Sequence, residues 1–386
     1  MKKTPNVDFV YFDAGGGHRN AATAVQSAIE AGHRGWNVRL VNLQEVLNPL
    51  DVFRKLTRVR LEDIYNLMLA KGWTLGSRQL LPLMHAVIRM YHPAQVKLLT
   101  GYWQQRRPDM VVSFVPNFNR ALCESLSAAL PGVPFVTIIT DLADYPPHFW
   151  IEEQPQYFVS GSRRGVEQAV QMGHPTSRVF RVSGMILRPH FYEAHTVDPD
   201  EGRRTLGLNP DLPTGLVLFG GQGSNVMYPI AKRLGNSRLN LQLIMICGRN
   251  TTLRARLHRL KTRNKIFVEG FTNQIPYYMR LSDFFVGKPG PASISEALHM
   301  NLPVIVECNA RTLPQECYNA EWIRKQGVGI VLKSFRRVET GVTKLLENLD
   351  GFKNNISRLE NRALFEIPPI LERILRDGTD APRPAA

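Results

Sequence analysis

Two stretches of the chain share one local pattern, an apolar strand followed by a glycine-rich loop and a helix, and this repetition constrains the fold most. In the first stretch, residues 7–12 lead into Gly15-Gly16-Gly17-His18 and a helix expected over residues 20–31. In the second, residues 215–219 lead into Gly220-Gly221-Gln222-Gly223-Ser224. Strands that alternate with helices predict parallel sheets covered on both faces. The sequence therefore predicts an α/β protein with two doubly wound, Rossmann-like halves.

Further apolar stretches continue the pattern on each side of a polar, Pro- and Gly-rich segment at residues 190–211, which we interpret as a linker. The other expected strands are residues 38–43, 110–114, 135–139, 157–160 and 179–182, then 241–247, 266–269, 284–286, 304–306 and 329–332. The expected organisation is an N-terminal domain at 1–198 with a helical insertion at about 47–107, a C-terminal domain at 199–350, a C-terminal helix at 351–376 that packs back on the N-terminal domain, and a loose tail at 377–386.

The charge of the chain limits the class of partner. It has 48 Lys and Arg against 33 Asp and Glu, a net charge of +15, which favours nucleic acid, an anionic lipid surface or a phosphorylated ligand. No RRM, KH or helix-turn-helix pattern is present, so we expect no nucleic-acid partner. The four cysteines form no CxxC pair, and Asp8 and Asp13 interrupt any N-terminal signal segment. We therefore expect a cytoplasmic protein with reduced thiols.

The first glycine-rich loop ends in His18, and an imidazole at the mouth of a loop that follows a strand can act as a general base. Glycines let backbone N–H groups approach a ligand, and the following helix adds a partial positive charge. The loop matches neither the Walker A nor the GxGxxG pattern. The alternatives are a tight turn for the loop and a capping or space-filling role for His18.

The second glycine-rich loop likewise offers backbone N–H groups and the N-terminus of a following helix, so it suits a pyrophosphate. A loop of this kind in each half suggests a cleft between the halves that binds an anion on one side.

Two polar motifs follow later strands of the second half. In the segment 287–298, Ser293 or Ser295 is expected to cap a helix, and Glu296, in its first turn, to accept hydrogen bonds from ribose hydroxyls. In the segment 313–319, the side chains of Gln315, Glu316 and Asn319 fall within about one helical turn and suit the hydroxyls of a sugar. A carboxylate near a helix N-terminus and a solvated helix start are the structural alternatives.

Two single residues carry weaker indications. Asp141 comes directly after the apolar residues 135–139, which places a carboxylate at the end of a strand. Arg188 is suited to pairing with a phosphate.

In this order the motifs resemble those of the GT-B glycosyltransferases of family 28. That family includes monogalactosyldiacylglycerol synthases, processive diacylglycerol glucosyltransferases and the enzyme that adds N-acetylglucosamine to lipid I. The resemblance runs from about residue 7 to residue 332. It is carried by residues 15–18, 65–66, 140–141, 145–150, 184–191, 220–225, 288–298 and 314–320.

The resemblance implies an inverting transferase that uses a UDP-sugar and needs no metal or other cofactor. His18 would deprotonate the acceptor hydroxyl, and Glu296 would hold the ribose of the donor. The other acceptor-binding residues would be Gly16, Gly17, Asn117 and Asp141. The other donor-binding residues would be Gly221, Gln222, Gly223, Ser224, Arg188, Phe271, Gly290, Ser293, Gln315 and Glu316. Tyr145 stands where the family has the histidine of its HPxWF segment, which leaves the sugar and the acceptor open.

The insertion at 47–107 mixes basic residues with Leu, Met and aromatic residues, a composition typical of a helix that lies on an anionic membrane surface. The alternative is a helical subdomain whose apolar side is buried in the protein. We therefore expect a peripheral membrane enzyme on the inner face of the cell membrane that moves glucose or galactose to a lipid hydroxyl, with diacylglycerol as the first choice. The alternatives are a transferase for another lipid-linked or soluble acceptor and a non-catalytic nucleotide-sugar-binding membrane protein.

Overall fold

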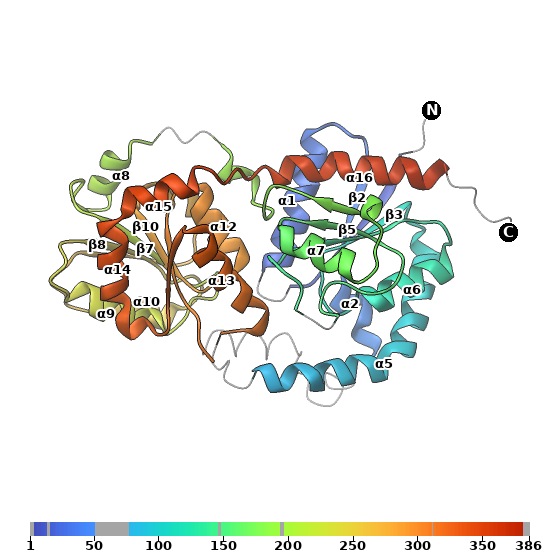
Figure 1. Cartoon of the computed structure of the whole chain (residues 1–386), viewed down its shortest axis with the longest axis horizontal. Coiled ribbons are helices and arrows are strands. Elements are labelled where there is room, and N and C mark those ends of the chain that lie inside the picture. Colours follow the sequence, from blue (N-terminus) through green and yellow to red (C-terminus); the bar gives the residue numbers. More distant parts are fainter. Residues whose placement is uncertain are drawn as a thin grey trace. The chain divides into compact units, whose positions relative to one another are not determined.

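The computed structural model describes residues 4–13, 16–50, 77–145, 148–193, 197–310 and 312–380 (Figure 1). These residues divide into two compact units. Unit 1 contains the described residues of 4–50, 78–189 and 361–380. Unit 2 contains Ser77 and the described residues of 190–360. Each unit holds one sheet of six parallel strands, which confirms the predicted α/β class and the doubly wound, Rossmann-like halves.

The sheet of unit 1 has the strand order β2-β1-β3-β4-β5-β6, and every pair of neighbours is parallel. Its strands are short and their apolar side chains are largely buried, as expected when helices cover both faces. The strands are β1 (Asn6–Tyr11), β2 (Asn37–Asn42), β3 (Met110–Ser113), β4 (Phe135–Ile139), β5 (Tyr157–Ser160) and β6 (Val179–Arg181).

The helices that pack on this sheet come from the N-terminal part of the chain and from its C-terminal end. The α-helices are α1 (Gly17–Ala31), α2 (Leu43–Leu47), α5 (Ser77–Arg106), α6 (Asn119–Ala129), α7 (Arg163–Gln171) and α16 (Ala363–Asp380), and the short 3-10 helices are η1 (Asn48–Leu50) and η2 (Thr176–Arg178). Leu99 and Trp103 of α5 are fully buried in one cluster with Leu122 and Leu126 of α6. The last helix, α16, lies against α1, and Arg34 pairs with Glu372 at 3.4 Å (Figure 1).

Unit 2 repeats the architecture with the strand order β12-β11-β10-β7-β8-β9. Its strands are β7 (Thr214–Leu218), β8 (Gln242–Ile246), β9 (Ile266–Glu269), β10 (Phe284–Gly287), β11 (Val304–Glu307) and β12 (Gly329–Leu332). One cluster joins buried residues of β7, β8 and β10 to α9 and α14, and Phe284 and Leu243 are fully buried in it.

The α-helices of unit 2 are α8 (Pro199–Thr205), α9 (Met227–Gly235), α10 (Thr251–His258), α11 (Ile275–Arg280), α12 (Pro291–His299), α13 (Cys317–Gln326), α14 (Val338–Glu347) and α15 (Leu349–Ile356). Short 3-10 helices are η3 (Pro189–Phe191), which begins at the unit boundary, η4 (Pro314–Glu316) and η5 (Phe335–Arg337). Among the residues that the structure describes, no helix combines the length and the apolarity needed to cross a bilayer.

Three expected features differ from the structure. The predicted linker at 190–211 contains α8, because Asp198 caps the helix by accepting from the Asp200 N–H at 2.9 Å and Pro199 suits its first turn. The single helix expected at 351–376 is two helices, α15 in unit 2 and α16 in unit 1, and α16 continues to Asp380 into the expected loose tail. Part of the predicted insertion, residues 51–76, lies outside the described residues, and the rest contains η1 and α5.

A buried carboxylate joins three elements of unit 1. Asp8 lies on β1 with a fully buried side chain, and the strand register places it opposite Arg39 of β2. Its Oδ1 accepts from Arg39 Nε at 2.5 Å, and its Oδ2 accepts from Arg106 Nε, near the end of α5, at 3.2 Å. Arg39 also donates through Nη1 and Nη2 to the backbone oxygen of Arg106 at 3.2 Å. Both carboxylate oxygens of Asp8 therefore have charged donors.

We expect Asp8→Asn to lower the free energy of unfolding of unit 1 by about 3 kcal/mol, because it leaves two guanidinium groups without their counter-charge. Arg106→Gln should cost less, since Arg39 still pairs with Asp8. Urea denaturation of both variants measures the difference. Equal stability of Asp8→Asn and wild type would show that the pair contributes nothing to unit 1.

Candidate active site

The carboxyl ends of β1, β3 and β4 gather the first set of predicted site residues in unit 1. These strands are neighbours in a parallel sheet, so the residues that follow them meet at one edge. Gly16 takes a left-handed conformation with φ of 77° and caps α1, which places His18 as the second residue of the helix. Gly17 has no heavy atom within 4 Å of the place where a Cβ would stand, apart from its own neighbours.

The imidazole of His18 is held between β4 and a buried indole. Its Nδ1 lies 3.1 Å from Oγ1 of Thr140, and its ring centroid lies 5.7 Å from that of Trp150. Burial of the ring, which the surrounding loops cover in part, lowers the pKa of His18 from 6.5 to about 4, and a hydrogen bond to the backbone of Phe114 opposes this shift. The ring is therefore neutral at pH 7, the state that a general base needs.

Trp150 is fixed by hydrogen bonds at both of its N–H groups. Its indole Nε1 donates to Asp141 Oδ2 at 2.8 Å, and its backbone N–H donates to Asp144 Oδ1 at 2.7 Å. Its carbonyl accepts from Nδ2 of the buried Asn119 at 2.9 Å. Because the indole is fully buried, these bonds hold the ring that lies beside His18 in one position. We did not predict Trp150 or Thr140 as site residues, although both lie in segments that carry the resemblance.

The two acceptor-binding residues predicted on the later loops have structural partners. Asn117 takes a left-handed backbone conformation with φ of 68°, and its N–H donates to the Phe149 carbonyl. The carboxylate of Asp141 is almost wholly buried and accepts from Trp150. Both residues therefore shape the loops around His18.

Two further carboxyls, on the loop that carries Trp150, hold protons more tightly than usual. Burial raises the pKa of Asp144 to about 6 and the pKa of Glu152 to about 7. Glu152 Oε2 lies 3.2 Å from His148 Nδ1. The loop that carries Trp150 therefore contains groups that titrate near neutral pH.

In unit 2, the loop between β7 and α9 contains two glycines with different roles. Gly223 has a φ of 66°, and a Cβ there would stand 2.1 Å from the Cys247 carbonyl, so the fold itself requires glycine. A Cβ on Gly221 would meet only Phe271 Cε2, at 4.0 Å, outside its chain neighbours. Gly221 also accepts from the Arg249 N–H at 2.9 Å. The surface over Gly221 is therefore open to a ligand.

An aromatic ring and a guanidinium group stand beside this loop. The side chain of Phe271 is 53% exposed, which is unusual for a large apolar residue. The guanidinium carbon of Arg249 lies 4.9 Å from the centre of its ring. Gln222 and Ser224 belong to the same loop, and Ser224 is buried, with its Oγ accepting from the Val226 N–H at 3.4 Å.

The structure corrects our prediction for the start of α12. The residue that caps this helix is Gly290, and neither Ser293 nor Ser295 caps it, because both lie inside the helix that begins at Pro291. Pro291 suits the first turn because it lacks the N–H that would stay unpaired there. Glu296 consequently lies in the second turn rather than the first, and the carboxylate-at-the-terminus alternative is wrong. Glu296 is partly exposed.

A partly buried ion pair joins the two polar motifs of unit 2, at residues 287–298 and 313–319. Lys288 Nζ donates to Glu316 Oε1 at 3.0 Å, and Glu316 is almost wholly buried. The Lys288 Cε lies 4.0 Å from the Cβ position of Gly220, so the pair stands next to the glycine-rich loop. Gln315 is partly exposed beside it. Asn319 is fully buried and donates from Nδ2 to the Pro289 carbonyl at 2.8 Å, so it supports the turn before α12.

The predicted residues thus form two groups. Gly16, Gly17, His18, Asn117 and Asp141 belong to unit 1, as does Arg188, which we predicted to bind the donor. All other predicted donor-binding residues belong to unit 2. In the described part of the chain, no group of three or more His, Cys, Asp or Glu side chains could hold a metal ion.

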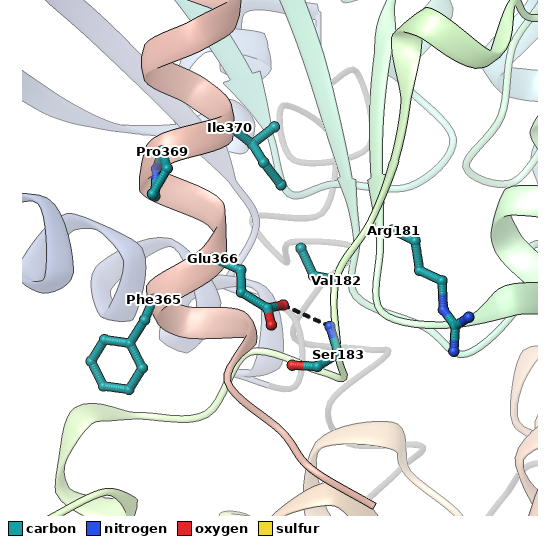
Figure 2. A pocket seen from close by; sticks show the side chains of 7 residues that line it. All are labelled: Arg181, Val182, Ser183, Phe365, Glu366, Pro369 and Ile370. Carbon is teal, nitrogen blue, oxygen red and sulfur yellow. Dashed lines mark hydrogen bonds between the residues drawn. The ribbon is translucent and has the colours of Figure 1, made fainter.

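Figure 2 shows an open pocket of about 660 Å³ elsewhere in unit 1, between the end of β6 and α16. The Glu366 carboxylate closes one side by accepting from the Ser183 N–H at 2.7 Å. None of the predicted site residues lines it.

Comparison with known proteins identifies the second unit. Residues 216–370 match the glycosyltransferase family 28 C-terminal domain. This match begins in β7. It includes the glycine-rich loop of unit 2 and the two polar motifs that follow later strands.

Relatives extend the likeness over nearly the whole chain. The probable monogalactosyldiacylglycerol synthase 2 of Oryza sativa subsp. japonica is 29% identical over 94% of this chain and 79% of its own length. The monogalactosyldiacylglycerol synthase of Spinacia oleracea is 27% identical over 94% of this chain and 71% of its own length. Among solved structures, MurG of Acinetobacter baumannii has a TM-score of 0.60 and 12% identity, with 96% of this chain and 99% of that chain covered.

The fold of two parallel sheets, the matched domain and the relatives lead to one conclusion: the chain has the GT-B glycosyltransferase fold, contains a glycosyltransferase family 28 C-terminal domain at residues 216–370 and is similar over most of its length to the monogalactosyldiacylglycerol synthases.

Proposed function

We propose that this protein transfers a hexose from a UDP-sugar to the hydroxyl of a membrane lipid, with diacylglycerol as the acceptor and inversion at the anomeric carbon. The observation that carries the proposal is the neutral His18 at the carboxyl edge of unit 1, in a chain that matches proteins named monogalactosyldiacylglycerol synthases over 94% of its own length. Glucose and galactose both remain candidate sugars.

On the acceptor side, His18 would act as the general base. If Nδ1 carries the proton and donates to Thr140 Oγ1, Nε2 is left to accept the proton of the lipid hydroxyl. The hydroxyl oxygen then attacks the anomeric carbon, and the bond from that carbon to the diphosphate oxygen breaks. The electron pair of that bond leaves with UDP.

On the donor side, unit 2 supplies backbone donors and helix N-termini. The open surface over Gly221 and the N-terminus of α12 after Gly290 suit a diphosphate. Glu296 would hold the ribose, Phe271 the uracil ring, and Gln315 and Glu316 the sugar. We propose that these groups bind the donor without a metal ion, because partial positive charges from helix N-termini lie where the phosphates would bind.

We further propose that the enzyme works as a peripheral protein on the cytoplasmic face of the membrane. A lipid acceptor requires contact with a membrane, and a UDP-sugar is supplied from the water phase. The exposed Met90 of α5, at 69% exposure, is consistent with a surface that meets lipid.

The proposed activity is tested with diacylglycerol vesicles and a panel of UDP-sugars, with the lipid products analysed by mass spectrometry. We expect a product heavier than diacylglycerol by one hexose with UDP-glucose or UDP-galactose. UDP binding by calorimetry without any glycolipid would instead favour the non-catalytic alternative. Transfer to a soluble acceptor alone would exclude the lipid.

His18→Ala should lower the rate of transfer by at least about 10²-fold, because the acceptor hydroxyl loses its base. UDP affinity should stay within about twofold of wild type, since His18 belongs to unit 1. Steady-state rates and calorimetry measure the two effects. Unchanged turnover would remove His18 from the mechanism.

The pH profile separates a buried His18 from an exposed one. With a pKa of about 4, His18 is still about 90% neutral at pH 5, whereas an ordinary imidazole with a pKa of 6.5 would be almost fully protonated. We therefore expect kcat/KM at pH 5 to stay within about threefold of its value at pH 7. A fall of tenfold or more between these pH values, with folding intact by circular dichroism, would contradict a rate controlled by His18 alone and would assign it to a group with a higher pKa, such as Asp144 at about 6 or Glu152 at about 7.

The two glycines of the second loop provide a matched pair of variants. Gly221→Ala should keep the stability of wild type but weaken UDP binding by at least about tenfold, because its methyl group would occupy the open surface where a phosphate approaches. Gly223→Ala should instead lower stability by about 2 kcal/mol, because its Cβ meets the Cys247 carbonyl. Thermal unfolding and calorimetry distinguish them. Normal UDP affinity in Gly221→Ala would place the diphosphate elsewhere.

A further inference from the structure

Unit 2 carries an uncompensated band of positive charge at the edge of its sheet opposite the donor loops. Residues 212–268 contain many Lys and Arg but no Asp or Glu. Exposed basic side chains from this stretch occupy the end of α9, the loop before β8 and the loop before β9, at the amino ends of the strands. We call this group the basic edge: Lys232, Arg238, Arg259, Lys261, Arg263 and Lys265.

Hydrogen bonds hold the two loops of the basic edge side by side. The buried Asn264, in the second loop, donates from Nδ2 to the carbonyls of Leu234 and Leu239 at 2.8 Å and 2.9 Å. Its backbone N–H donates to the Gly235 carbonyl at 2.8 Å. Gly235 allows this approach, because a Cβ there would stand 2.5 Å from Thr262 Cγ2. The cations are therefore attached to one ordered surface.

Within the described residues, none of the six cations forms an ion pair with a carboxylate. Other arginines of the same unit do: Arg203 pairs with Asp283 at 3.0 Å, and Arg254 lies 3.8 Å from Glu269. Acidic residues of the neighbouring elements include Asp211 before β7, Asp283 before β10, which pairs with Arg203, and Glu347 at the end of α14, which packs against α9. The charge of the basic edge thus faces solvent without internal compensation.

We propose that the basic edge is a docking surface for a membrane rich in anionic phospholipid. Clusters of four to eight Lys and Arg attract such membranes, and each cation contributes independently to binding. The assignment to lipid rests on the proposed function, in which the acceptor is a membrane lipid. The glycine-rich loop of unit 2 lies at the opposite edge of the sheet, so this docking leaves the donor loops accessible to a nucleotide sugar from the water phase.

The chemistry of the surface favours lipid headgroups over single-stranded nucleic acid. Binding of unpaired bases uses exposed aromatic rings as stacking surfaces. The exposed large apolar side chains of the described residues are Met90, Val170, Val197, Phe271 and Phe365, and none belongs to the basic edge. Contact through charge alone, without an apolar side chain that inserts, also predicts strong sensitivity to salt.

The test compares two triple variants of the full chain that lose the same charge. Arg238→Gln/Arg259→Gln/Lys261→Gln removes half of the basic edge, whereas Lys325→Gln/Arg336→Gln/Arg337→Gln removes three exposed cations elsewhere in unit 2. Co-sedimentation uses phosphatidylcholine vesicles with and without about one third phosphatidylglycerol, at about 0.1 M and about 0.5 M NaCl. UDP affinity, and transfer to diacylglycerol in detergent micelles, are measured for each variant.

We expect the basic-edge variant to bind anionic vesicles about 10²-fold more weakly than wild type at low salt, and the control variant to bind within about threefold. UDP affinity should stay normal in both. Equal losses in the two variants, or none in either, would overturn the proposal. Tighter binding of wild type to a short RNA than to anionic vesicles, lost in the basic-edge variant, would replace lipid by nucleic acid. Loss of vesicle binding only in the basic-edge variant supports the docking surface even if no lipid is glycosylated.

Discussion

Parallel pairing of the strands determines where chemistry can occur in each unit. In a sheet whose strands all run the same way, every carboxyl end and every following loop lies at one edge, next to the N-termini of the crossover helices. In unit 1 this edge gathers Gly16, His18 and Thr140 from segments far apart in the sequence. In unit 2 it gathers the Gly221 loop, the start of α12 and the Lys288–Glu316 pair. Backbone hydrogen bonds, not the site residues, create both locations.

Burial then sets the protonation states of the side chains gathered at this edge of unit 1. His18 is neutral because its ring is buried in part between Thr140 and an indole that is itself fixed at two N–H groups. Burial also raises the pKa values of Asp144 and Glu152, which lie on the loop that carries Trp150. This loop therefore favours the neutral form of the neighbouring base, His18, and of its own two carboxyls. The cost of burying Asp141 is offset by the hydrogen bond that it accepts from Trp150.

The sequence was most informative where local physics dominates. Apolar runs bounded by glycine placed the strands to within one or two residues, since a buried parallel strand must be apolar on both faces. The cap of α12 was predicted wrongly because Ser293 and Ser295 look like capping residues, whereas Pro291 makes the helix begin earlier, after Gly290. Thr140 and Trp150 were missed as partners of His18 because they are more than a hundred residues away in sequence, and only the sheet brings them close. The Lys288–Glu316 pair was missed because its two residues follow neighbouring strands, β10 and β11, and only the sheet brings them together.

Unit 2 presents positive potential in two physically different forms. At the donor edge it comes from backbone N–H groups and helix termini beside the guanidinium group of Arg249, and Lys288 is paired with Glu316. Such partial charges act over short distances and depend on direction, because their effect falls off within the first turn of the helix. At the basic edge it comes from whole charges on long, solvated side chains, which act at longer range, accept many geometries and weaken as salt is added. The donor edge is therefore suited to binding one ligand in one orientation. The basic edge is suited to attraction to an extended anionic surface. The two edges of one sheet can thus serve substrate binding and membrane docking separately.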